Sequence, residues 1–347
     1  MQSEILAEVI RGETVESIHR GHLIVVDGDG ETVFSKGNPE TITFFRSSSK
    51  AFQAFPVLMS GAAERFGFSD AEIALACGSH SGEKIHTETC AKMLAKIGLS
   101  EPDLRCGAHL PFNEAVAEEM IRAGEKPNQL HNNCSGKHAA MLALAKHLGA
   151  DLQSYEDLEN PVQKAILETV SLFTNVPTDE IKIGIDGCAA PNFALPIRAM
   201  ATSFARIVFP PVTFDAETRE ACRRIVSAMI SYPQMIGGTE RLDTIIMQSA
   251  RGRVISKIGA EGVYVAGVLP CERWEKGLGV AVKIEDGDDK RARAVVIIEL
   301  LRTLGVIDET NDANLRQYSP MPIKNRRGDK VGAVVSRQLS VNKNSNP

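Results

Sequence analysis

The sequence predicts an α/β protein whose mainly antiparallel sheet, flanked by helices, takes strands from both ends of the chain. Three observations favour this class: a hairpin pattern near the N-terminus, a long helix-rich middle, and three successive strand patterns followed by an amphipathic helix near the C-terminus. The compact arrangement of this order is one sheet, with the middle helices at approximately residues 60–250 inserted as a second lobe. We therefore expect a single domain over residues 1–347.

The N-terminal elements follow from local signals. Residues 22–26 and 31–35 read as strands on either side of Asp27-Gly28-Asp29-Gly30, and Asp-Gly between two β-rich runs favours a hairpin. The apolar run 51–55 predicts a helix that Pro56 is expected to kink or end. Ser69-Asp70-Ala71-Glu72 has the pattern of a capping box, so it should begin a helix that ends at Cys77-Gly78.

The middle of the chain is mostly helical. Capping residues and apolar periodicity predict helices at about 84–97, 113–123 and 137–148, the last ending at Gly149. Asn160-Pro161 should open another helix, because proline is favoured at the first helical position. A strand over 181–185 and helices near 193–206 and 215–230 complete this region.

The pattern then changes to strands. Residues 253–257, 263–268 and 279–284 read as three successive strands, and residues 290–304 as an amphipathic helix. The remaining C-terminal residues are polar and predict no clear element. We expect residues 340–347 to be disordered.

Composition limits the functional classes. The 347 residues are 43% hydrophobic and 24% charged, with a net charge of −5 and a pI of about 6.0. This balance argues against nucleic-acid and acidic-membrane partners. No apolar stretch approaches the ~18 residues of a membrane span, and acidic residues stand where a signal peptide would be basic. With seven irregularly spaced cysteines, these features predict a cytoplasmic protein.

A serine and a lysine stand three apart at the start of the first expected helix. Ser47 and Lys50 would share one helix face, where a neutral lysine can activate a serine hydroxyl as a nucleophile. The pattern S-x-x-K is weak by itself, since it also occurs at Ser81–Lys84 and Ser340–Lys343. The alternative is that Ser47 only caps a helix.

Two further patches strengthen the hydrolase interpretation. Ser79 lies directly after a predicted helix, and Lys257-Ile258-Gly259 ends a predicted strand. Together with Ser47 and Lys50, these patches resemble the three motifs of penicillin-binding enzymes and class A β-lactamases, and they occur in the same chain order. The second and third motifs depart from that pattern, with Ser81 in place of asparagine and Ile258 in place of threonine.

A fourth patch has metal-binding character. Cys134, Lys137 and His138 fall within one turn at the start of a predicted helix, and Cys188 follows a predicted strand. Two thiolates with one or two nitrogen donors make a reasonable zinc site. The alternative is that both cysteines are small buried residues, because two distant cysteines identify no metal.

Taken together, these segments resemble the rhizobial-type (class 3) L-asparaginases, the asparaginase II family, over roughly residues 15–305. The heptapeptide around Cys134 is the most specific of them. The matching segments are Arg46-Ser47-x-x-Lys50, Cys77-Gly78-Ser79-His80-Ser81, Asn132-Asn133-Cys134-Ser135-Gly136-Lys137-His138, Asp186-Gly187-Cys188, Lys257-Ile258-Gly259-Ala260 and Lys283-Ile284-Glu285-Asp286-Gly287.

The resemblance implies a serine β-lactamase-like fold, a homodimer and hydrolysis of L-asparagine to L-aspartate and ammonia. It also implies roles for ten residues. The catalytic residues would be Ser47, Lys50, Ser79 and Lys257, the zinc ligands Cys134, Lys137 and Cys188, and the residues lining the asparagine pocket Arg46, His138 and Asp186.

The expected mechanism is an acyl-enzyme formed on a serine, with a lysine as base. The sequence leaves open whether Ser47 or Ser79 is the primary nucleophile, and we favour Ser47 because it stands at a helix start. Two alternatives remain. One is a β-lactamase-like or peptidase-like serine hydrolase on the same fold, and the other is a non-catalytic zinc-binding redox sensor.

Overall fold

A computed structural model describes residues 2–308, 313–337 and 339. The chain divides into two compact units. The sheet unit comprises Met1–Ser48, Leu195–Pro211 and Ile245–Pro347, and the helical unit comprises Ser49–Ala194 and Val212–Thr244. The expectation of disorder at residues 340–347 concerns residues that lie outside the described ones. The expectation of a single domain over residues 1–347 stays a prediction.

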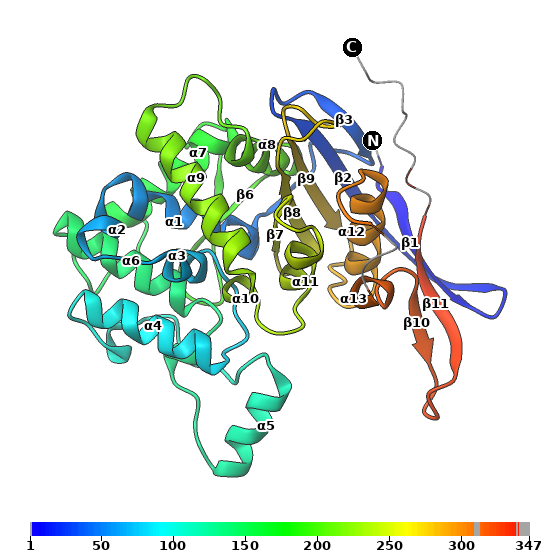
Figure 1. The fold of residues 1–347 in the computed structure, drawn as a ribbon, viewed down its shortest axis with the longest axis horizontal. Helices are drawn as coiled ribbons and strands as arrows, with labels where there is room; N and C mark the ends of the chain where they lie inside the picture. Colours follow the sequence, from blue (N-terminus) through cyan, green and yellow to red (C-terminus); the bar gives the residue numbers. More distant parts are fainter. Residues whose placement is uncertain (1, 309–312, 338, 340–347) are drawn as a thin grey trace. The chain divides into compact units, whose positions relative to one another are not determined.

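The sheet unit is built on one antiparallel sheet whose strands come from both ends of the chain (Figure 1). The strand order is β10-β11-β1-β2-β9-β8-β7, with β3 also paired to β2. The predicted α/β class and the antiparallel sheet made by both chain ends are therefore confirmed. The strands are β1 (Glu4–Arg11), β2 (Thr14–Asp27), β3 (Thr32–Lys36), β7 (Val254–Ile258), β8 (Val263–Val268), β9 (Leu278–Ile284), β10 (Met321–Lys324) and β11 (Lys330–Ser336).

The predicted hairpin is formed by β2 and β3. The Asp27 carboxylate accepts hydrogen bonds from the N–H groups of Asp29 and Glu31, both at 3.0 Å, and Gly30 adopts a φ of 88°. Aspartate favours such turns because its carboxylate accepts hydrogen bonds from nearby backbone N–H groups, and glycine favours them because it adopts a positive φ without strain. The sequence did not predict β1, β10 or β11, whose partners are distant in sequence; Ala7, for example, lies opposite Ser336.

Two helices pack on the sheet. The helix α8 (Ile197–Val208) contacts β2, β8 and β9, and α12 (Ala292–Thr303) contacts β1, β8, β9 and β11. A Cβ atom on Gly279 would come within 1.9 Å of the Ala201 carbonyl oxygen, so the close approach of α8 requires glycine there. The unit also contains the short elements β4 (Ile42–Phe44) and α13 (Ala313–Arg316) and most of α11 (Leu242–Ser249).

The helical unit surrounds α6, a helix that is apolar and buried along most of its length. The rings of Phe52, Phe55 and Phe173 pack together between α1 and α7. The elements are α1 (Lys50–Met59), α2 (Ala62–Arg65), α3 (Asp70–Ala76), α4 (Lys84–Lys96), α5 (Glu114–Ala123), α6 (Ser135–Leu148), α7 (Pro161–Thr174), β5 (Lys182–Ile185), β6 (Pro191–Pro196), α9 (Ala216–Ser231) and α10 (Pro233–Ile236). No helix in the described part of the chain is long and apolar enough to cross a membrane.

Most local predictions in this unit are confirmed. The Ser69–Glu72 capping box begins α3, Asn160 caps α7 with Pro161 at its first position, and Gly149 ends α6 with a φ of 68°. The helix α1 continues past Pro56 to Met59 rather than ending there.

The predicted helix over 193–206 is wrong at its start. Residues Pro191–Pro196 form β6, which pairs with β5, and α8 begins only at Ile197. Pro196, with φ −60° and ψ 143°, is extended and marks the boundary. The hydrophobic residues of this stretch fit either structure, and the pairing with β5 decides for the strand.

Candidate functional site

The serine stretch begins in a strained backbone conformation. Residues Arg46–Ser49 form a 3₁₀ turn that leads directly into α1, and Arg46 adopts a φ of 55°. A non-glycine residue in this region costs roughly 1–3 kcal/mol and is held there only by its surroundings. Ser47 follows and is half-buried. The predicted nucleophile thus stands next to a strained residue, as is common at functional sites.

Within the sheet unit, this stretch lies beside the end of β7. The Ser48 hydroxyl donates a hydrogen bond of 3.1 Å to the carbonyl oxygen of Lys257. Gly259 is equally close, since a Cβ atom there would lie 3.0 Å from the Ser48 oxygen. The Lys257 side chain is 1% exposed, and its ammonium donates to the carbonyl oxygen of Ile258 at 2.9 Å. The sheet unit therefore places Arg46 and Ser47 in the same neighbourhood as Lys257.

Within the helical unit, Lys50 is buried among backbone carbonyls. Its Nζ atom donates to the carbonyl oxygens of Gly78 at 2.7 Å and Asn133 at 3.1 Å. Burial lowers the pKa of Lys50 and the nearby Lys137 charge acts the same way, while Cys134 and Cys188 act to raise that pKa. Burial of a lysine without a carboxylate partner favours its neutral form, which is the form a general base needs.

Ser79 lies next to the carbonyl group that holds Lys50. Its N–H donates to the Ile236 carbonyl oxygen at 2.7 Å, which fixes the chain just after α3. Its hydroxyl oxygen is buried and has no hydrogen-bond partner among the described residues. A buried hydroxyl without a partner costs free energy, which functional sites tolerate and cores avoid. Ser79 is therefore available for chemistry.

Cys134, Lys137 and Cys188 come together, as the fourth sequence patch predicted. The Lys137 ammonium donates to the Cys188 sulfur at 3.0 Å, and the Cys134 side chain also bonds that sulfur. The bond from Cys134 lowers the pKa of Cys188, helped by the Lys137 charge, while the same bond raises the pKa of Cys134. Burial acts to lower the pKa of Lys137, but the charges of Cys188, Cys134 and Asp186 and the hydrogen bond to Cys188 together outweigh burial and raise that pKa. Cys188 is thus a thiolate between a thiol and an ammonium.

His138 is oriented by a residue that sequence reasoning missed. Its Nδ1 atom lies 2.7 Å from the Tyr155 hydroxyl, which also accepts a hydrogen bond from the Arg105 N–H at 2.9 Å. The Tyr155 hydroxyl therefore links the His138 ring to the Arg105 backbone and fixes the orientation of that ring. The Nε2 atom of His138 makes no hydrogen bond of normal geometry to described residues. His138 is nevertheless close enough to Cys188 to lower the pKa of the Cys188 thiol. No periodic or motif signal in the sequence points to Tyr155.

Two other histidines hold the segments that carry site residues. The Nε2 atom of His80 lies 2.9 Å from the Ser135 hydroxyl, which ties the Ser79 loop to the start of α6. The Asn133 N–H donates to Nε2 of His109 at 3.0 Å. His80 lies within a matching sequence segment, but His109 stands outside all of them and only its contact with Asn133 reveals it.

Asp186 lies in the turn between β5 and Cys188. Its carboxylate accepts a hydrogen bond from the Gly187 N–H at 2.9 Å and contributes to raising the pKa of Lys137. Ala189, which follows Cys188, has a φ of 69°, so this turn is strained like the residue before Ser47. The helical unit therefore gathers six of the predicted residues, Lys50, Ser79, Cys134, Lys137, His138 and Cys188, with Asp186 at their edge.

The donor set fits a zinc ion only if protons leave. Among the described residues, no three His, Cys, Asp or Glu side chains are arranged to hold a metal ion. The two cysteines converge, however, and Lys137 supplies a third donor at the same sulfur. Zinc binds a thiolate and a neutral amine, so its binding there would release protons from Cys134 and Lys137.

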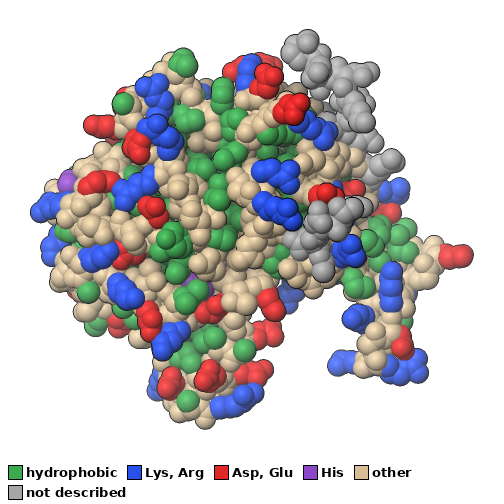
Figure 2. All heavy atoms as spheres, viewed as in Figure 1, with side chains coloured by type: hydrophobic (Ala, Val, Ile, Leu, Met, Phe, Trp, Pro, Cys, Tyr) green, Lys and Arg blue, Asp and Glu red, His purple; other side chains and the backbone are tan. Residues whose placement is uncertain are grey.

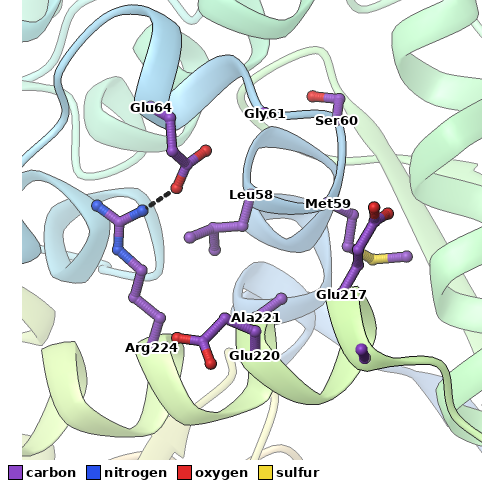
Figure 3. Close-up of a pocket in the computed structure, with 10 residues that line it drawn as sticks. Leu58, Met59, Ser60, Gly61, Glu64, Glu217, Glu220, Ala221 and Arg224 are labelled. Atoms are coloured by element: carbon purple, nitrogen blue, oxygen red, sulfur yellow. Dashed lines mark hydrogen bonds and ion pairs between the residues drawn. The ribbon is translucent and has the colours of Figure 1, made fainter.

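A separate hollow of the helical unit contains none of the predicted residues. It has a volume of about 450 Å³ and lies between α1 and α9 (Figure 3). Leu58 and Met59 line it together with Glu217 and Glu220, while Arg224 is held by Glu64. Its acidic groups are exposed or already paired, so it is not part of the site described above.

Comparison with known proteins defines the class. The family model described as L-asparaginase II, a family of amidohydrolases, matches residues 7–336. The chain therefore belongs to the L-asparaginase II family. No significantly similar sequence was found among curated proteins.

Two glutaminase structures are among the structural matches. A probable glutaminase from Bacillus subtilis, complexed with 6-diazo-5-oxo-L-norleucine, is 15% identical with a TM-score of 0.37, covering 83% of this chain and 85% of its own. A Bacillus glutaminase in the presence of 4.3 M NaCl is 14% identical with a TM-score of 0.38, covering 83% and 91%.

Proposed function

We propose that the protein hydrolyses L-asparagine to L-aspartate and ammonia through a serine acyl-enzyme with lysine as the base. Family membership supports amide hydrolysis. The observation that carries the mechanism is Lys50, which directly follows the turn containing Ser47 and is buried so that its pKa is lowered. A lysine in this state can take a proton from a serine hydroxyl near neutral pH.

The proposed steps use only side chains of this chain. The Ser47 oxygen attacks the side-chain amide carbon of asparagine, and neutral Lys50 accepts the serine proton. The C–N bond then breaks, and the leaving nitrogen takes a proton and departs as ammonia. Ser79 and Lys257 relay that proton. Water attacks the resulting ester, which releases aspartate and restores the Ser47 hydroxyl.

We further propose that Arg46, His138 and Asp186 bind the substrate's polar groups. An α-amino acid carries a carboxylate and an ammonium, and this set offers a cation, an acid and a neutral donor. Tyr155 contributes indirectly, because its hydroxyl contacts Nδ1 of His138 and orients that ring.

Zinc is proposed as a cofactor held by Cys134, Lys137 and Cys188. When bound, it would supply an orienting ligand for the substrate's α-amino or carboxylate group, since two thiolates and an amine leave it a poor Lewis acid. Because Lys137 is held as an ammonium whose pKa is raised, the metal must compete with its proton. Zinc affinity should therefore fall as the pH drops.

The proposed activity is tested by measuring ammonia release from L-asparagine, with L-glutamine and nitrocefin as comparison substrates. We expect asparagine to be hydrolysed, because the chain belongs to the L-asparaginase II family. Turnover of nitrocefin without asparagine hydrolysis would favour the β-lactamase-like alternative. Bound zinc with no hydrolysis of any of the three would favour the redox sensor.

Removing zinc with a chelator should raise KM for asparagine more than it lowers kcat, because the proposed metal acts in binding. Cys188→Ser should have the same effect. Cys222→Ser is the matched control, since Cys222 is another buried thiol of the helical unit, on α9, whose pKa burial raises to about 12. A thousandfold loss of kcat at constant KM would instead place zinc in the chemical step. Unchanged constants would leave it structural at most, or absent.

A further inference from the structure

The position of Ser79 depends on its backbone. Its hydroxyl oxygen is buried and has no hydrogen-bond partner among the described residues, so no hydrogen bond of its own orients that side chain. The preceding residue is fixed by α3, because the Gly78 N–H donates to the Leu75 carbonyl oxygen at 2.9 Å. The contacts of residues 79–83, which we call the serine segment, therefore determine where the Ser79 oxygen lies.

A turn at residues 236–239 lies alongside the serine segment and holds its first residues. The Ser79 N–H donates to the Ile236 carbonyl oxygen at 2.7 Å. The Ser81 hydroxyl donates to the Gly237 carbonyl oxygen, also at 2.7 Å. Both bonds end on backbone carbonyl groups of the turn, so they place Ser79 only while the turn keeps its conformation.

Glu83, the last residue of the serine segment, holds this turn. Its carboxylate accepts hydrogen bonds from the Thr239 N–H and from the Thr239 hydroxyl, both at 2.8 Å. It also accepts one from the side-chain amide of Asn113 at 3.3 Å. The Asn113 N–H in turn donates to the Ser81 carbonyl oxygen at 3.0 Å. One carboxylate therefore joins three parts of the helical unit, namely the serine segment, the turn and the N-cap of α5.

The turn brings its backbone close to this carboxylate. Gly238 adopts a φ of 108°, and a Cβ atom there would lie 2.6 Å from Oε1 of Glu83, so only glycine fits. The acidic side chains of α5, by contrast, are exposed, and Asp and Glu side chains gather over that helix at the bottom of Figure 2. Glu83 is therefore a bound group of the helical unit rather than a surface charge.

The three donors match an ionised carboxyl group. Burial acts to raise the pKa of Glu83, but the hydrogen bonds from Thr239 and Asn113, together with the nearby His86, outweigh burial and lower that pKa. Alanine in this position would accept none of the three bonds. Glutamine would preserve them, because its amide oxygen can accept from two donors and the Thr239 hydroxyl can turn to accept from its NH₂ group.

We propose that Glu83 is a positioning residue for Ser79, because it holds the turn whose backbone places the Ser79 hydroxyl. This inference rests on the proposed function, in which Ser79 and Lys257 relay a proton to the leaving nitrogen. Glu83 exchanges no proton in this role and acts through the bond between Ser79 and Ile236. Without its carboxylate the turn is less constrained, so the Ser79 oxygen is less often placed for proton transfer.

The test is a double-mutant cycle on kcat for asparagine that combines Glu83→Ala with Ser79→Ala. Glu83→Ala alone should lower kcat by about thirtyfold with little change in KM, because a misplaced Ser79 affects proton transfer and not substrate binding. On the Ser79→Ala background the same change should lower kcat by less than about twofold, because the hydroxyl that Glu83 positions is already absent. Glu83→Gln should keep kcat within about threefold of the unaltered value, because it preserves the hydrogen bonds.

Hydrogen exchange measures the positioning without using activity. In the folded Glu83→Ala protein, peptides from the serine segment and the 236–239 turn should exchange at least about tenfold faster, whereas those from α7 should not change. If Glu83→Ala does not fold, Thr239→Val replaces it in the cycle, since it removes one hydrogen bond and should lower kcat by about fivefold. The control Glu119→Ala removes an exposed carboxylate of α5 and should alter neither kcat nor exchange.

The inference is overturned if Glu83→Ala keeps a normal kcat, if its loss multiplies fully with that of Ser79→Ala, or if exchange in the serine segment is unchanged. It is also overturned if Glu83→Gln loses as much kcat as Glu83→Ala, since that would show that the charge acts directly. A normal kcat in Ser79→Ala itself would contradict the proposed relay, and this inference with it, even if exchange in Glu83→Ala is faster.

Discussion

Replacing Ser47 with alanine is expected to lower kcat for asparagine by on the order of 10⁴-fold while leaving the fold intact. Ser47 is the proposed nucleophile, so its loss removes the atom that forms the acyl-enzyme. It is half-buried in a 3₁₀ turn, and alanine retains the backbone conformation there. Turnover is measured by ammonia release under saturating asparagine, and thermal unfolding checks that the protein is folded.

Ser49→Ala is the matched control for this substitution. Ser49 lies in the same turn and precedes α1, but its side chain does not cap the helix. The Ser49→Ala enzyme should keep kcat within about threefold of the unaltered value. If Ser47→Ala keeps near-normal turnover instead, the nucleophile is Ser79, whose hydroxyl is buried without a partner among the described residues.

Ser79→Ala and Lys257→Met are each expected to lower kcat by about a thousandfold, and the double variant should be little worse than either. If Ser79 and Lys257 relay one proton together, removing either side chain interrupts the same step. Methionine preserves most of the volume of Lys257, which is 1% exposed, so the loss concerns the amine rather than packing. The measurement is a double-mutant cycle on kcat.

Lys84→Met provides the control for this cycle. Lys84 belongs to a second S-x-x-K match, but its side chain is 85% exposed and pairs only weakly with Glu88. Its replacement should change kcat by less than twofold, alone or combined with Ser79→Ala. Losses that simply multiply in the Ser79→Ala/Lys257→Met variant would show that the two residues act separately.

Local chemistry was readable from the sequence wherever neighbouring residues decide the structure. The Ser69–Glu72 capping box, the Asn160-Pro161 helix start and the Gly149 helix end all form as expected, because each depends on bonds within a few residues. The sequence motifs likewise indicated the family. The strands β1, β10 and β11 were not predicted, because only pairings such as Ala7 with Ser336 stabilise them.

The candidate site, too, was determined partly by the sequence and partly by the tertiary structure. From the sequence, Lys50 is a lysine three residues after a serine, and its neutrality is only a requirement of the proposed chemistry. The tertiary structure supplies the reason, because the carbonyl groups of Gly78 and Asn133 meet its amine in a buried place that lowers its pKa. Sequence motifs thus determined which chemical groups are present. Folding alone decided their protonation, since burial and charge depend on residues that are distant along the chain.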